Sequence, residues 1–132
     1  MDDDRLLRWA TAVYVVGFAV HTADHARRGI DAVGDGVVWA GTFSSMLAAV
    51  AVALVVVRHP SAPLLALAIG LPQAIGFFAV HVLPTWGALS DSYPSGDVDG
   101  WSWAATSMEI AGALVFAAAG AWALRVRLPA SD

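Results

Sequence analysis

The chain has 132 residues, enough for one domain, and its formal net charge is −4. Hydrophobic residues make up 58% of it, charged residues make up only 14%, and it contains no cysteine. This composition provides no basic surface for a nucleic acid, and it excludes disulfides, thiolate metal sites and iron–sulfur clusters. The few charges gather in short clusters that leave long uncharged segments between them.

The first of these segments is the weakest candidate for a membrane span, which needs about 20 mostly apolar residues. Only residues 9–23 lack a charge, so a span over residues 6–26 requires Arg8 to snorkel at one end. At the other end, the stretch His21–His25 must enter the membrane. The second span, residues 36–57, has no charge at all.

The third span covers residues 62–83 and the fourth covers residues 101–124, where Glu109 is the one charged residue. The sequence therefore predicts an all-α integral membrane protein with a single domain, residues 1–132, built as an antiparallel up-down-up-down four-helix bundle. Because the connections are short except for residues 84–100, helices adjacent in the sequence should be adjacent in space.

Small residues recur every four positions on three of the spans, a pattern that lets membrane helices approach closely. The stripes are Gly41, Ser45, Ala49 and Ala53 on the second, Ala66, Gly70 and Ala74 on the third, and Ala113, Ala117 and Ala121 on the fourth.

Arginine placement predicts the orientation in the cell (plasma) membrane. With four spans, the two ends and the loop around Arg58 share one side, which carries five arginines, whereas the other side carries only Arg27 and Arg28. Both termini are therefore expected in the cytoplasm. The aromatic residues at the opposite end are expected at the membrane interface: Trp86, Tyr93, Trp101 and Trp103.

Ionisable residues inside the spans are the strongest functional signal, because they are costly in a bilayer and usually face protein. His21, Asp24 and His25 stand at i, i+3 and i+4 on the first span, His81 ends the third, and Glu109 lies in the fourth. Other polar residues share these faces or the start of the second span: Gln73, Ser102, Thr106, Thr42, Ser44 and Ser45.

These polar groups also lie at matching depths. At about 1.5 Å per residue, His21 lies about 9 Å inward from Arg27, and Glu109 lies about 12 Å inward from Trp101. The sequence therefore predicts one buried polar site in the extracytoplasmic half of the bundle.

A divalent metal, zinc or iron, is the first interpretation of this site. The i, i+4 spacing allows His21 and His25 to bind one ion, and His81 supplies a third nitrogen. Asp24 is the expected oxygen ligand, and Glu109 is the candidate catalytic residue as a general base beside a metal-bound water. Whether the chain is an enzyme is left open by the sequence.

Three other interpretations remain open. A bis-histidine haem b would use His81 and one histidine of the first span as axial ligands. A lipid or isoprenoid pocket would use Glu109 and a histidine as an acid–base pair or to hold a polar head. An accessory subunit of a larger membrane complex would use Asp24 and Glu109 only in structural pairs with histidine or Arg28.

The predicted orientation can be tested by cysteine labelling, because the chain has no cysteine of its own. A Ser95→Cys variant should react with a membrane-impermeant maleimide added outside intact cells. A His59→Cys variant, in the loop beside Arg58, should react only after the cells are permeabilised. The opposite pattern would show that the arginine count predicts the wrong orientation.

Overall fold

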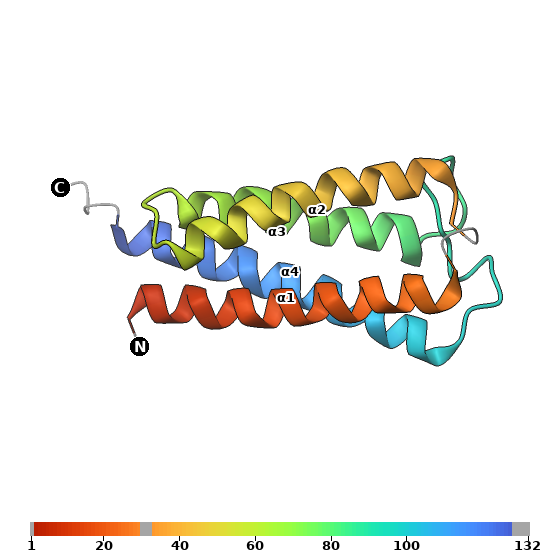
Figure 1. The fold of residues 1–132 in the computed structure, drawn as a ribbon, viewed down its shortest axis with the longest axis horizontal. Helices are drawn as coiled ribbons and strands as arrows, with labels where there is room; N and C mark the ends of the chain where they lie inside the picture. The colour runs from red at the N-terminus through yellow and green to blue at the C-terminus, as the bar shows by residue number, and fades with distance from the viewer. Residues whose placement is uncertain (1, 30–32, 128–132) are drawn as a thin grey trace.

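A computed structural model of the chain describes residues 2–29 and 33–127, and none of these residues forms a strand (Figure 1). The elements are α1 (Asp3–Arg28), α2 (Asp35–Val56), α3 (Ala62–Phe77), the short π-helix η2 (Phe78–Val82) and α4 (Gly100–Arg127). With η2 continuing α3, four helices are long and apolar enough to cross a membrane. The expected all-α fold with four such helices is confirmed for the described residues.

The first helix is longer than its uncharged stretch because polar residues fit both of its ends. The Asp2 carboxylate accepts a hydrogen bond from the Arg5 N–H at 2.8 Å and caps the N-terminus. At the other end, Arg27 and Arg28 lie where the helix dipole favours positive charge.

The end of the third helix differs from the prediction, because its last turn is a π-helix rather than an α-helix. The following loop folds back over this turn. The Asp91 N–H donates to the Val80 carbonyl at 3.0 Å, and the Tyr93 N–H donates to the His81 carbonyl at 2.9 Å. These bonds satisfy carbonyl groups that a helix end leaves without partners. They also bring Asp91 and Tyr93 beside His81.

The fourth helix is the centre of the packing, since it makes extensive contacts with both α1 and α3. Glycines make these contacts possible. A Cβ atom added at Gly17 of α1 would lie 2.6 Å from the Met108 carbonyl oxygen of α4. One added at Gly120 of α4 would lie 2.5 Å from the Pro63 carbonyl oxygen of α3. Any larger side chain would push these backbones apart.

The expectation that neighbours in sequence are neighbours in space is wrong for α1 and α2, which hardly touch. The second helix packs mainly against α3 and lies away from α1 (Figure 1). The physical reason is that α4 packs closely against both α1 and α3. The face of α1 that can contact other helices is therefore covered by α4.

The small-residue stripes show the same asymmetry. Those on α3 and α4 are buried apart from the half-buried Ala121, but Ala49 and Ala53 on α2 are exposed. No described residue outside the local helix backbone lies within 4 Å of a Cβ added at Gly41. The predicted stripe on α2 is therefore wrong as a packing surface. The buried face of that helix contains Ala48, Ala51 and Val55.

A polar link in the core joins three helices. The Tyr14 hydroxyl of α1 donates to the Gln73 side-chain carbonyl of α3, and the Tyr14 ring stacks on Phe116 of α4 with centroids 4.9 Å apart. The Gln73 amide then donates to the Ser44 carbonyl of α2 at 2.9 Å. Through α3, this link connects α2 to α1, the helix that α2 hardly touches directly.

A matched pair of glycine substitutions tests this packing. Gly17→Ala should lower the free energy of unfolding by about 1–3 kcal/mol, because the new methyl group overpacks a backbone contact. Gly41→Ala should be neutral or stabilising, because its methyl group meets open space and alanine favours helix. Unfolding of the detergent-solubilised protein measures both. Equal effects of the two substitutions would show that α1 and α4 are not in close contact.

Candidate functional site

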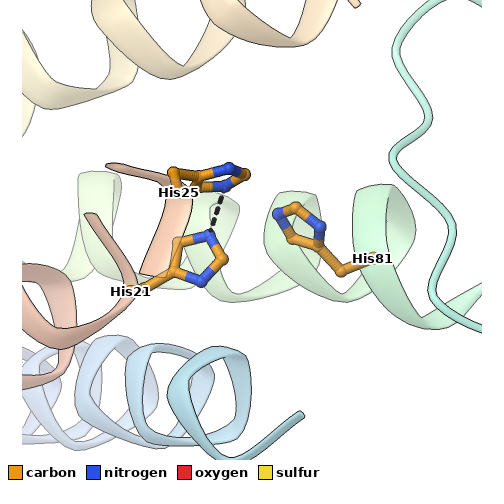
Figure 2. Close-up of side chains that lie close together, drawn as sticks. All are labelled: His21, His25 and His81. Atoms are coloured by element: carbon orange, nitrogen blue, oxygen red, sulfur yellow. Dashed lines mark hydrogen bonds between the residues drawn. The ribbon is translucent and has the colours of Figure 1, made fainter. Parts of the chain in front are cut away.

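Three of the four histidines of the chain converge at one end of the helices. His21 and His25 come from successive turns of α1, and His81 comes from η2 with its ring turned toward the pair (Figure 2). One ring nitrogen from each residue lies within 4.8 Å of the other two. The Nε2 atoms of His21 and His25 are 3.0 Å apart. His21 and His81 are buried, and His25 is partly buried.

This spacing is close to that of ligands around one ion. Two nitrogens that each lie 2.0–2.1 Å from a tetrahedral zinc ion are roughly 3.4 Å apart. The His21 and His25 pair already has about this separation. Together with His81, the three ring nitrogens lie within 4.8 Å of one another, so this group could hold a metal ion.

Hydrogen bonds to the other ring nitrogen set the orientation of His21. The Thr106 hydroxyl of α4 lies 3.1 Å from the Nδ1 atom of His21 and 3.0 Å from the Tyr93 hydroxyl, within hydrogen-bond distance of both. The other ring nitrogen of His21, Nε2, faces His25.

The loop between η2 and α4 orients His81 in a similar way. The Nδ1 atom of His81 lies 3.2 Å from the Asp91 carbonyl oxygen and 3.4 Å from its carboxylate. Arg28 holds that carboxylate with two hydrogen bonds, of 2.9 and 3.2 Å. A carboxylate behind a histidine is a common arrangement around metal ions, where it fixes the ring and raises its basicity.

The same contacts keep Asp91 ionised. Burial by itself would raise the pKa of Asp91, but hydrogen bonds from His81 and the Arg28 guanidinium outweigh it and hold this pKa well below its ordinary value. Arg28 also lies over the ring of Tyr93, 5.1 Å from its centroid. Burial raises the pKa of Tyr93, so this hydroxyl keeps its proton.

Glu109 completes the site from α4. Its side chain is 1% exposed, and its Oε2 atom lies 3.5 Å from the Nε2 atom of His21. Buried carboxylate oxygens are nearly always satisfied, but among the described residues neither this oxygen nor the Oδ2 atom of Asp24 has a hydrogen-bond partner.

The role of Asp24 as an oxygen ligand stays a prediction. Asp24 does not belong to the group of converging nitrogens, and its Oδ1 atom forms an ion pair with Arg27 at 2.9 Å. Arg27 in turn reaches Asp99 at the start of α4, also at 2.9 Å. From His21, the i+3 and i+4 positions point roughly 100° apart around a helix, so Asp24 and His25 face different neighbours.

Tyr93, Asp91 and Thr106 surround the histidines, but the sequence did not identify their roles. Tyr93 was expected at the membrane interface, yet it is 2% exposed and packs against His81 with ring centroids 4.8 Å apart. Spacing along a helix could not have found Asp91 or Tyr93, because both lie in a loop. The position of Thr106 one turn before Glu109 was the only signal for it.

A cavity of about 490 Å³ adjoins the histidines. It lies between α1, α2 and α3, and most of its walls are apolar. Its polar lining includes the three histidines, Glu109 and Gln73. The volume is within the range of small-molecule binding sites.

Comparison of the chain with protein-family models, with curated proteins and with solved structures gives no match.

An Asp91→Asn substitution tests how the loop is fastened. Because the pKa of Asp91 is depressed in the folded protein, its charge adds stability above the ordinary aspartate pKa of about 3.9, and this stability is lost as the pH falls through the folded value. The substitution should cost about 1–3 kcal/mol at neutral pH, and the difference from the native chain should shrink below about pH 4.

Thermal unfolding across this pH range measures the effect. Asp97→Asn is the control, because Asp97 is an exposed carboxylate of the same loop. Equal losses for the two variants at neutral pH would mean that the contacts of Asp91 with His81 and Arg28 do not stabilise the fold.

Proposed function

We propose that the chain is a four-span protein of the plasma membrane that holds one divalent metal ion, zinc or iron, between His21, His25 and His81. In this proposal the helices cross in up-down-up-down order with both termini in the cytoplasm. The metal then lies in the extracytoplasmic half of the bilayer. The convergence of three imidazole nitrogens from α1 and η2 is the observation that carries the metal assignment.

Exposed apolar side chains support the membrane part of the proposal. Soluble proteins seldom expose large continuous apolar surfaces. Here Trp39, Phe43 and Met46 of α2 are all more than 60% exposed. On α4, Trp101 and Trp122 are each 55% exposed and stand 21 positions apart (122 − 101). That separation is about 32 Å of helix, close to the roughly 30 Å thickness of the bilayer core between its two tryptophan-rich interfaces.

The surroundings of the histidines support a metal more than an ordinary polar core. Hydrogen bonds fix two of the rings through Nδ1, by Thr106 for His21 and by Asp91 for His81. Three nitrogen ligands leave a fourth tetrahedral position open, as in zinc sites that bind water or substrate. Glu109, whose Oε2 atom lies 3.5 Å from the Nε2 atom of His21, would be the group to take a proton from a metal-bound water or hydroxyl group.

The alternatives account for less of the geometry. A haem between His21 and His81 would need room for a flat macrocycle, but His25 lies against both rings, with centroids 4.5 and 5.5 Å away. A purely structural role explains the ion pair of Asp24 with Arg27. It does not explain three adjacent imidazoles beside the unpaired oxygen of Glu109.

Metal analysis of single-histidine variants tests the proposal. The native chain purified in mild detergent should bind one zinc or iron ion per molecule, as measured by elemental analysis and by calorimetric titration. His81→Ala should weaken binding by more than about 100-fold, beyond the effect usual for the loss of an outer-sphere partner. His59→Ala should bind normally, because His59 lies in the loop between α2 and α3.

Two results would contradict the proposal. One is a native chain that neither retains a metal ion nor takes one up. The other is a loss of binding in His59→Ala as large as that in His81→Ala.

A further inference from the structure

The cavity beside the histidines opens toward the side of the protein. Its rim includes exposed side chains from two helices that hardly touch, Thr22 on α1 and both Phe43 and Leu47 on α2. Since these helices are proposed to cross the bilayer, the opening faces lipid chains rather than water. A molecule that enters from this side must itself be largely apolar.

The inner end of the cavity requires two different properties of a bound molecule. The Oε2 atom of Glu109 can accept a hydrogen bond, and no donor among the described residues reaches it. A metal ion on the three histidines would need a lone pair at its open position. A hydroxyl group is the simplest group that supplies both, because its oxygen carries a lone pair and one proton.

We propose that the cavity binds a single-chain lipid alcohol, with its chain between α1, α2 and α3 and its hydroxyl oxygen on the metal. The hydroxyl proton is then donated to Glu109. This inference rests on the proposed metal site and names the class of molecule that this site takes. The hydrocarbon chain occupies the apolar part of the cavity, which extends along α2 and α3.

Charged lipid head groups fit this site poorly. Among the residues that the structure describes, no arginine lines the cavity. The two nearest along α1 are already held by carboxylates, Arg27 by Asp24 and Asp99, and Arg28 by Asp91. A phosphate would therefore find no basic partner, and a fatty acid would place a second carboxylate beside Glu109. A lipid amine would bring a positive charge next to the metal ion.

A cobalt-substituted protein tests this proposal, because the visible absorption bands of Co²⁺ change when a new ligand enters its coordination sphere. The full chain in lipid nanodiscs is loaded with Co²⁺ and titrated with a long straight-chain primary alcohol. The corresponding methyl ether and the alkane of equal length serve as matched ligands. The alcohol should change the bands saturably. The ether lacks the proton for Glu109 and should need at least about tenfold more ligand, and the alkane should have no effect.

Two sets of variants test separately the binding of the lipid's hydrocarbon chain and the binding of its hydroxyl group. Gly41 lines the cavity, and there is open space around its Cβ position, so Gly41→Leu should fill the cavity without disturbing the helix. Gly41→Leu should keep the cobalt bands and lose the response to alcohol, while Gly41→Ala should keep both. Glu109→Gln should keep cobalt and raise the half-saturating amount of alcohol about tenfold.

The outcomes distinguish this proposal from the one on which it rests. Normal cobalt bands that no alcohol changes, or that the alkane changes equally, would overturn the alcohol proposal and leave the metal site standing. A response that survives in Gly41→Leu would also overturn it, since the alcohol would then bind elsewhere. A chain that binds no cobalt at all would refute both proposals.

Discussion

The close contact between α1 and α4 at Gly17 is the constraint on which the site depends. Because Gly17 has no side chain, the backbone of α4 at Met108 and Glu109 comes within van der Waals contact of α1. His21 stands one helical turn further along α1, so the same contact brings the carboxylate of Glu109 to 3.5 Å from its ring. Any residue larger than glycine would separate the acid from the imidazole as well as the two helices.

The absence of hydrophobic driving force between membrane helices explains why such contacts matter. Lipid chains are as apolar as leucine, so helices associate in a bilayer mainly through close packing and hydrogen bonds. Glycine and alanine on α4 provide the close packing with α1 and α3, and the bond of Tyr14 with Gln73 provides a buried polar link. The second helix makes few close-packed contacts and few hydrogen bonds with α1. That is why a cavity remains between the two helices.

The loop between η2 and α4 acts as a cover that fixes the histidines. Its backbone amides bond to the carbonyls of η2, its Asp91 orients His81, and its Tyr93 joins Thr106 behind His21. Arg28, at the end of α1, holds the loop through Asp91. Two ion pairs of α1 with residues C-terminal to η2, Arg28 with Asp91 and Arg27 with Asp99, therefore fasten the end of the protein where the site lies.

The sequence by itself determined the helical architecture, because long uncharged stretches bounded by charges form membrane-length helices whatever their neighbours are. It also identified His21, His25, His81 and Glu109, since ionisable groups inside apolar segments are too costly to be placed without partners. Residues four positions apart lie on the same face of any α-helix, so the sequence spacing by itself placed His21 and His25 together.

Only the tertiary structure decided which partners these residues meet. Asp24 pairs with Arg27 three positions along the same helix, and the approach of α4 adds Asp99 as a second partner of Arg27. The separation of α1 from α2 followed from backbone contacts at glycines, which a repeat of small residues does not specify. Tyr93 and Asp91 became part of the site because a loop folds over η2, and loops carry no periodic pattern from which such a contact could be predicted.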